Sequence, residues 1–150
     1  MNSDVEVSSI PGEIKEETVG EMLKRIELVV DGMDNVRTRL VLNKACYGNG
    51  IPYIYGGIFG LRGSVTTIIP GQTPCLSCFV KDERHDGSPI PAIGPVVGTI
   101  ASIQVMEALK VLLRFGTVLA GELLRYDGSR MTFSKMALKK RPDCPVCSGS

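Results

Sequence analysis

The sequence predicts an α/β domain whose sheet mixes parallel and antiparallel strands. The domain should also contain a structural zinc site. Three observations lead to this fold class. Extended and helical patterns alternate as far as Gly50. Beyond that residue, β-rich segments follow one another with only glycine-containing turns between them. Four of the five cysteines form two Cys-x-x-Cys pairs that lie far apart in the chain.

The segment before Gly50 predicts a β-α-β-α order. Val5 and Val7 alternate with polar residues, which predicts a short extended strand, and helical spacing of apolar residues follows over residues 15–25. The apolar run 28–30 is typical of a strand in a parallel sheet. A second helix is predicted over residues 35–47, ended by the glycine-rich sequence that follows it.

The remaining elements are mostly strands. Segments 51–55 and 64–69 predict successive antiparallel strands, and segments 123–126 and 131–135 predict a closing hairpin about Asp127-Gly128. The polar, proline-containing stretch 81–91 predicts an exposed crossover loop. Between these regions a long helix should run from Pro95 to about residue 114. Its broad apolar face would comprise Val97, Ile100, Ala101, Gln104, Ala108, Leu109 and Leu112.

The two cysteine pairs are Cys75 with Cys78 and Cys144 with Cys147. Two thiolates separated by two residues can bind one side of a tetrahedral metal ion from a tight turn, and the distant pair would complete the site. We therefore expect one Zn²⁺ bound by these four sulfurs. Because sulfur fills every position, no water can be activated, so the zinc would be structural. Two disulfides or four free thiols are the alternatives, and disulfides would require an oxidising compartment.

The composition excludes several functional classes. Hydrophobic residues make up 43% and charged residues 22%, which is ordinary for a soluble globular protein. A net charge of +1 argues against nucleic-acid binding and against a role at a membrane surface. No uninterrupted apolar run reaches the roughly 18 residues of a membrane helix, and the N-terminus lacks the features of a signal peptide. We therefore expect a cytoplasmic protein.

Several motifs in combination resemble the ThiF/MoeB/HesA family, which comprises relatives of the ubiquitin-activating enzymes. The resemblance covers essentially the whole chain, from Asp31-Gly-Met-Asp34-Asn35 through Pro70-Gly-Gln-Thr-Pro-Cys75 and Gly94-Pro-Val-Val-Gly98 to Arg141-Pro-Asp-Cys144. It implies the C-terminal part of a Rossmann-like fold. It also implies ATP-dependent adenylylation of the C-terminal glycine of a ubiquitin-like sulfur-carrier protein, as in thiamin or molybdopterin synthesis or in thiolation.

The resemblance also implies which residues act on ATP and Mg²⁺. In this family the second aspartate of the Asp-x-x-Asp-Asn run helps to hold magnesium beside the phosphates, and that position is Asp34 here. Asn35 and Arg39 are the other candidates for the ATP environment. A carboxylate just beyond the carboxyl end of a strand suits Mg²⁺. The structural alternatives are an N-cap for Asp34 and a solvated helix position for Arg39, and the latter is the interpretation that we favour for Arg39.

Two departures from the family pattern matter. No glycine-rich phosphate-binding turn occurs in the chain, and the family's ribose-binding and phosphate-binding residues precede the region seen here. We therefore expect a C-terminal portion of such an enzyme, inactive by itself. The crossover loop contains no cysteine, which fits the route without a thioester. Cys46 should be a small buried residue, and His85 a solvated loop residue.

Two kinds of function remain open. One is an adenylating enzyme; the other is a non-catalytic, zinc-stapled module that docks a carrier or forms a dimer. The expected partners are a ubiquitin-like sulfur carrier and either a second copy of the chain or an N-terminal segment. Small residues on the long helix, Gly98, Ala101 and Ala108, would allow close approach either of the chain's own sheet or of a partner. The strand at 28–30 should leave an open parallel edge that promotes self-association.

Overall fold

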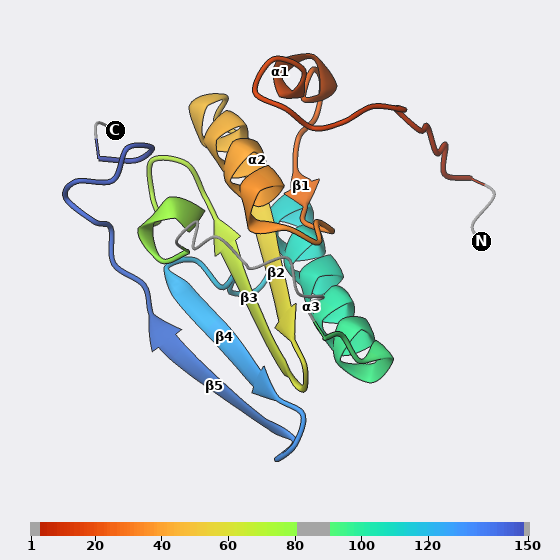
Figure 1. The fold of residues 1–150 in the computed structure, drawn as a ribbon, viewed down its shortest axis with the longest axis vertical. Helices are drawn as coiled ribbons and strands as arrows, with labels where there is room; N and C mark the ends of the chain where they lie inside the picture. Colours follow the sequence, from red (N-terminus) through yellow and green to blue (C-terminus); the bar gives the residue numbers. More distant parts are fainter. Residues whose placement is uncertain (1–3, 81–90, 149–150) are drawn as a thin grey trace.

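The structure is a computed structural model that describes residues 4–80 and 91–148. Its five-stranded sheet has the strand order β1-β2-β3-β4-β5 (Figure 1). The parallel pairing of β1 with β2 and the antiparallel pairing of all later neighbours confirm the predicted mixed sheet. The strands are β1 (Val29–Val30), β2 (Tyr53–Phe59), β3 (Arg62–Ile68), β4 (Glu122–Asp127) and β5 (Thr132–Ala137).

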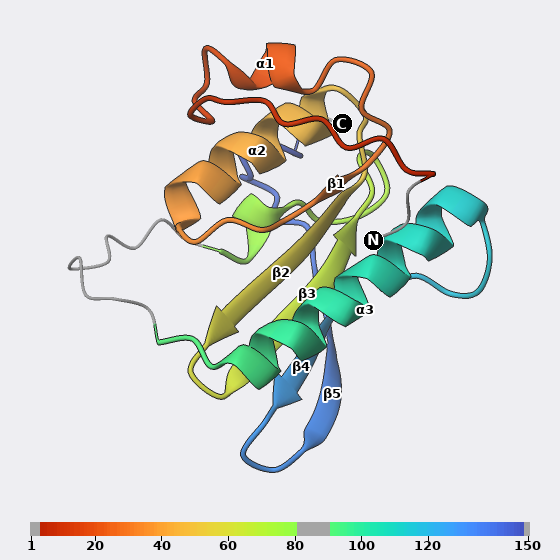
Figure 2. The ribbon, with the colours of Figure 1, turned by 90° about the vertical axis from the view of Figure 1, so that its right-hand side faces the viewer.

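Two helices cover opposite faces of the sheet. Figure 2 shows α2 (Val36–Gly48) on one side of β2 and α3 (Gly94–Leu113) on the other. Successive side chains of a strand point to opposite faces, so each helix packs on its own half of the core. Tyr53 and Tyr55 belong to the cluster beneath α2, whereas Ile54 belongs to the cluster beneath α3. The short helix α1 (Val19–Met22) lies against α2, and a turn of 3₁₀ helix, η1 (Leu76–Cys78), follows β3.

Two glycines allow α3 to approach the sheet closely. A Cβ atom at Gly63 would lie 2.4 Å from the Ile100 side chain, and one at Gly56 would lie 2.4 Å from the Gln104 side chain. The Gln104 amide donates hydrogen bonds to the carbonyls of Asp31 (2.9 Å) and Ile54 (3.1 Å). The helix therefore fixes the carboxyl end of β1 through a polar contact that a larger residue at Gly56 would displace.

The predicted extent of α3 is confirmed, but its predicted buried face is partly wrong. The buried residues are Val96, Ile100, Gln104, Glu107 and Ala108, whereas Val97, Ala101, Leu109 and Leu112 are exposed. The helix is apolar nearly all round, so periodicity could not select a face. By length and composition alone α3 could cross a membrane, a property that the search for uninterrupted apolar runs missed. It lies along β2 and β3, as core helices do.

The N-terminal region departs furthest from the prediction. Val5 and Val7 are exposed and form no strand, because no described strand lies beside them to complete a ladder. The helix predicted over 15–25 is reduced to the single turn of α1. Thr18 takes part in its own turn, donating through its hydroxyl to the Glu13 carbonyl (2.8 Å), and Arg25 has a φ of 64°, which no α-helix accommodates.

The other predicted elements are confirmed with small shifts. The first of the predicted antiparallel strands extends beyond residue 55 through Gly56 and Gly57, and the turn to β3 is made at Gly60, whose φ is 57°. The closing hairpin forms about Asp127-Gly128 as predicted. Most of the predicted crossover loop, including His85, lies outside the described residues.

Candidate functional site

The four predicted cysteines converge on one point. Their Sγ atoms all lie within 4.8 Å of one another, with 3.5 Å between Cys75 and Cys144 and 3.3 Å between Cys78 and Cys147. A tetrahedral ion with Zn–S bonds of about 2.3 Å would separate its ligands by roughly 3.8 Å. A disulfide would need about 2.05 Å, so the arrangement fits a shared metal ion and not two disulfides.

Two tight turns present these sulfurs. The backbone N–H of Cys78 donates to the Cys75 carbonyl in η1 (3.0 Å), and that of Cys144 donates to the Arg141 carbonyl in the tail (3.2 Å). The Arg141 N–H also points at the Cys78 sulfur, 3.5 Å away. Figure 1 shows η1 and the C-terminal tail side by side. The cluster is thus the point at which the tail joins the body.

The surroundings of the cluster shift the pKa values of its thiols in different directions. Burial raises the pKa of the Cys75 thiol. Burial acts in the same direction on Cys144, but backbone N–H groups of Val146 and Cys147 donate toward its sulfur and lower its pKa to about 7. Cys46 lies outside the cluster and is 1% exposed, and burial raises its pKa to about 12. The prediction that Cys46 is a small buried residue is confirmed.

A second polar site lies where β1 ends. Asp31 is 4% exposed, and its Oδ2 atom lies 2.9 Å from Nε of Arg39. The same guanidinium donates to the carbonyls of Gly56 (2.9 Å) and Met33, and it lies over the ring of Tyr55 at 5.4 Å. The Arg39 side chain is only 15% exposed, so the favoured interpretation of a solvated residue is wrong. A buried carboxylate requires a paired cation, and Arg39 provides it.

Burial dominates the titration of Asp31. It raises the pKa of this carboxyl above its ordinary value, although the Arg39 charge and the N–H group of Met33 act in the opposite direction. The Met33 N–H donates to Asp31 Oδ1 at 2.8 Å, which shapes the first turn after β1. Asp31 is therefore a residue that organises the loop.

Asp34 is exposed and does not cap α2. The N-cap is Asn35, whose Oδ1 accepts a hydrogen bond from the Thr38 N–H at 2.8 Å. The N-cap alternative for Asp34 is therefore wrong, because the next residue fills that position. Asn35 Nδ2 also donates to Asp34 Oδ1 at 2.9 Å. Asp34 is exposed, and a carboxylate is a suitable ligand for a hard cation such as Mg²⁺.

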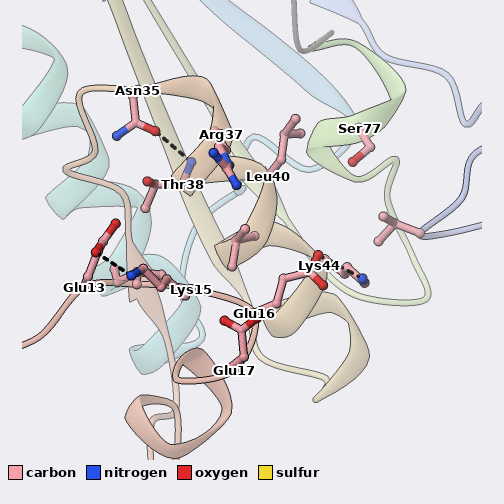
Figure 3. Close-up of a pocket in the computed structure, with 13 residues that line it drawn as sticks. Glu13, Lys15, Glu16, Glu17, Asn35, Arg37, Thr38, Leu40, Lys44 and Ser77 are labelled. Carbon is pink, nitrogen blue, oxygen red and sulfur yellow. Dashed lines mark hydrogen bonds and ion pairs between the residues drawn. The ribbon is translucent and has the colours of Figure 1, made fainter.

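A cleft of about 780 Å³ lies between α2 and the N-terminal segment. Figure 3 shows the side chains that line it. An ion pair from Lys44 of α2 to Glu16 (3.2 Å) joins the two sides, and Lys15 pairs with Glu13 (2.8 Å) within the N-terminal segment. Asn35 contributes to its lining, whereas Asp34 and Arg39 do not. The lining residues are Glu13, Ile14, Lys15, Glu16, Glu17, Asn35, Arg37, Thr38, Leu40, Val41, Lys44, Ser77 and Val146. Of the three candidates for the ATP environment, Asp34 and Asn35 contact each other, whereas Arg39 turns inward to Asp31.

One buried acidic residue was missed by the sequence analysis. Glu107 is 1% exposed, and its Oε2 accepts hydrogen bonds from the Thr67 hydroxyl (2.6 Å) and from the Leu119 N–H (2.7 Å). Its Oε1 pairs with Lys110 Nζ at 2.6 Å. The sequence feature that could have indicated this residue is a Glu–Lys pair, Glu107 and Lys110, three positions apart in an otherwise apolar helix. Glu107 joins α3 to β3 and to the connection before β4.

The sequence profile of the ThiF family matches residues 1–146. The chain belongs to the ThiF family. It is 37% identical over 98% of its length to the SAMP-activating enzyme E1 of Haloferax volcanii, covering 56% of that protein. It is 36% identical over 98% of its length to the sulfur carrier protein adenylyltransferase of Thermus thermophilus, covering 58% of it. The chain thus spans a little over half the length of these curated relatives.

Solved structures agree on the fold of this ThiF family chain. A structure of E. coli MccB with succinimide superimposes with a TM-score of 0.77 at 21% identity, over 97% of this chain and 46% of that one. A structure of E. coli MccB with ATP gives a TM-score of 0.69 at 19% identity, over 85% of this chain and 42% of that one. At these identities the likeness establishes the α/β fold.

Proposed function

We propose that this chain is part of an enzyme that uses ATP to adenylylate the C-terminal glycine of a ubiquitin-like sulfur-carrier protein. The observation that carries the proposal is its similarity, over 98% of its length, to a protein named as a sulfur carrier protein adenylyltransferase. The exposed carboxylate beyond β1 supports it, because ligands of open α/β sheets bind beyond the carboxyl ends of parallel strands.

In the proposed reaction the carrier's terminal carboxylate attacks the α-phosphate of ATP and pyrophosphate leaves. Asp34 would hold Mg²⁺ together with the ATP phosphates, and the ion would offset the negative charge of the two reactants. The described residues contribute by positioning. Asn35 holds the Asp34 carboxylate from one side, and the Asp31–Arg39 ion pair fixes the start of the loop.

We propose that the four-cysteine site holds Zn²⁺ in a structural role. The supporting observations are the mutual sulfur distances and a ligand set made only of thiols. A fully sulfur-ligated ion leaves no position for water or substrate. Its contribution would be to hold the C-terminal tail against η1. Thiolates that hold a metal would also agree with the cytoplasmic location that we propose.

We further propose that these 150 residues alone make no acyl-adenylate. No glycine-rich phosphate-binding turn occurs in their sequence, and one carboxylate holds magnesium only weakly. Without correct positioning of the reactants, the activation free energy of the reaction can rise by on the order of 7–11 kcal/mol. The test is carrier-dependent exchange of pyrophosphate into ATP, measured for the 150 residues and for a longer protein that adds a glycine-rich nucleotide-binding segment before them.

Asp34→Ala in the longer protein should abolish most of the exchange while leaving the zinc content unchanged. Glu27→Ala is the matched control, because Glu27 is also exposed but precedes β1 instead of following it. Equal activity of the Asp34→Ala protein and the wild type would refute the magnesium role. Exchange catalysed by the 150 residues alone would refute the proposal that they lack essential parts.

The second candidate function is a non-catalytic module that docks a carrier or pairs with another chain or an N-terminal segment. The observation that favours it is the exposed apolar side of α3, which includes Val105, Met106, Leu112 and Leu113. Carrier binding without any pyrophosphate exchange, even in the longer protein, would support this candidate against the first.

A further inference from the structure

A buried asparagine of α2 contacts the first cysteine turn, residues 75–78. Asn43 is 1% exposed, and its Oδ1 accepts a hydrogen bond from the Leu76 N–H at 2.9 Å. Its Nδ2 donates to the Ser77 hydroxyl at 3.4 Å. Leu76 and Ser77 are the two residues between Cys75 and Cys78. One side chain therefore holds the turn from which two of the four sulfurs project.

Asn43 belongs to a series of polar side chains on α2, each of which contacts a different segment. Positions four residues apart lie on one face of a helix. Arg39 pairs with Asp31 after β1, and one helical turn later Asn43 contacts the first cysteine turn. After one further turn, the Tyr47 hydroxyl accepts a hydrogen bond from the Gly71 N–H at 3.1 Å. Asparagine is a poor helix former, and a buried amide costs free energy unless it is hydrogen-bonded. The bonds of Asn43 to the first cysteine turn offset the cost of placing it in this helix.

Further contacts fix the first cysteine turn to the body of the protein. Before the turn, the Thr73 hydroxyl accepts a hydrogen bond from the Ile69 N–H at 2.9 Å. Leu76 is fully buried in the core beneath α2. The Val80 N–H donates to the Leu76 carbonyl at 2.9 Å, which closes the chain after the turn. None of these contacts involves sulfur, so they do not require a metal ion.

The second cysteine pair is attached in a different way. Its turn is closed by hydrogen bonds within the tail itself. Toward the body, the Arg141 N–H points at the Cys78 sulfur from 3.5 Å, and Lys140 Nζ donates to the Gly71 carbonyl at 3.3 Å from an exposed position. Val146 packs against the core but is only partly buried. These contacts are long, exposed or directed at sulfur, so they hold the tail weakly without a metal ion.

We propose that Asn43 is a positioning residue of the metal site: it holds the first cysteine turn in its metal-binding shape, so that the ion binds Cys75 and Cys78 first and then captures the tail pair. Ligands that are held in place beforehand bind more tightly, because less freedom is lost on binding. The inference rests on the metal site proposed above and goes beyond it, because it assigns the order in which the ligands bind and the residue that sets this order.

The first test is the zinc affinity of the 150-residue chain, measured by competition with a chromophoric chelator. Asn43→Leu leaves the Leu76 N–H without its acceptor and should weaken zinc binding by about 10–100-fold, the usual loss when a hydrogen-bond partner beside the ligands is removed. Asn49→Leu is the matched control. Asn49 is a second asparagine at the end of α2, but it is exposed and donates to the Ala45 carbonyl at 2.8 Å. It should leave the affinity within about twofold of wild type.

The second test compares the two cysteine pairs, with Co²⁺ as a spectroscopic probe. The Cys144→Ser/Cys147→Ser protein should still bind Co²⁺ through two sulfurs, seen as thiolate-to-cobalt charge-transfer absorption. The Cys75→Ser/Cys78→Ser protein, which keeps only the tail pair, should bind at least about tenfold more weakly. Adding Asn43→Leu to the first of these proteins should remove the difference. A merely structural role of Asn43 would not act on one cysteine pair and spare the other.

A destabilised protein with an intact first cysteine turn separates lost positioning from lost folding. Gly56→Ala disturbs the contact with Gln104 on the α3 side of the sheet, so it should lower stability but leave the zinc affinity within about twofold of wild type. Equal losses of affinity in Gly56→Ala and Asn43→Leu would overturn the inference, as would wild-type affinity in Asn43→Leu or equal binding by the two cysteine pairs. Each of these results would leave the metal site itself intact. A wild-type chain that binds neither Zn²⁺ nor Co²⁺ would overturn both the inference and the metal site.

Discussion

The cluster of Cys75, Cys78, Cys144 and Cys147 (the cysteine corner) and the β1 end of the sheet are stabilised in contrasting ways. At the corner, four sulfurs within 4.8 Å of one another join two segments about 70 positions apart in the sequence. At the other end, β1 has two residues, and its outer residue Val30 is 44% exposed. Polar contacts from both helices hold this end: the Asp31–Arg39 ion pair from α2 and the Gln104 amide from α3.

This difference shows two solutions to the shortage of apolar contact in a small structure. The tail beyond β5 has few buried side chains except its cysteines, so its attachment would depend on the single ion that we propose for the cluster. The β1 end depends on several buried polar groups, each of which must be satisfied. The corner should therefore fail all at once when the ion leaves. The β1 end should lose stability in steps, one contact at a time.

The largest effect should follow removal of the metal. Chelation, or Cys75→Ser, should release the tail from about residue 139 onward and lower the free energy of unfolding by several kcal/mol, up to on the order of 10. Metal analysis, thermal melts and limited proteolysis of the tail would measure this. Cys46→Ala is the matched control, because it removes a buried cysteine outside the cluster. It should retain one metal ion per chain.

The next largest effect should come from Arg39→Leu, which leaves Asp31 buried without its cation. Removing one partner of a buried ion pair costs about 3–5 kcal/mol of stability. The exposed neighbour Arg37 offers a matched control, since Arg37→Leu should change the free energy of unfolding by no more than about 0.5 kcal/mol. Equal effects of the two substitutions would contradict the role given to the ion pair.

The loss caused by Arg39→Leu should depend on pH. Burial raises the pKa of Asp31 above its ordinary value of 3.8, so the folded protein binds this proton more tightly than the unfolded chain. Stability from this group is therefore lost as the pH rises from 3.8 through the raised pKa. Without Arg39 the pKa rises further, so urea unfolding should show a greater loss at pH 7 than at pH 4. The same loss at both values would contradict this account.

The sequence predicted the elements whose signals are local. Helical periodicity with a terminal Gly-Asn-Gly predicted α2, and β-rich runs about Gly60 and Asp127-Gly128 predicted the antiparallel strands. The Cys-x-x-Cys spacing predicted each pair of cysteines and their common site, and the structure shows that the two pairs meet. These patterns are set by neighbours in the chain and survive in the folded structure.

The features that were missed depend on contacts between distant segments. Val5 and Val7 had strand-like alternation, but a strand forms only beside another strand. The inward direction of Arg39 depends on the burial of Asp31, and the bonds of Glu107 depend on β3. The buried face of α3 includes the predicted Gln104 but also Glu107, an acidic residue that a hydrophobic pattern counts against burial. Binding of magnesium and ATP near Asp34 stays a prediction.

A moderate effect should follow Gly56→Ala. The added Cβ would lie 2.4 Å from the Gln104 side chain, which would have to move and give up its bonds to Asp31 and Ile54. We expect a loss of about 1–3 kcal/mol in chemical denaturation. Gly98→Ala is the control, because no atom lies within 4 Å of a Cβ there. If Gly56→Ala were as stable as Gly98→Ala, the contact from α3 would not support the β1 end.

The smallest effect on stability should come from Val30→Lys, which acts on the open edge. A lysine there should leave the free energy of unfolding within about 0.5 kcal/mol but suppress self-association, because a charged side chain blunts an exposed strand edge. Sedimentation over a range of concentrations would measure it. Val5→Lys, at a residue outside the sheet that is 59% exposed, should have no such effect. A wild-type chain that stays monomeric throughout would show that the edge does not recruit a partner.

The most direct test of the contrast between the two ends is X-ray absorption at the zinc edge, combined with metal analysis of the purified chain. The account predicts one zinc per chain with four sulfur ligands at about 2.3 Å. It also predicts that Cys78→Ser lowers the sulfur count or abolishes binding, whereas Arg39→Leu leaves the spectrum unchanged. A protein without metal, a first shell containing nitrogen or oxygen, or disulfides among the four cysteines under reducing conditions would contradict it.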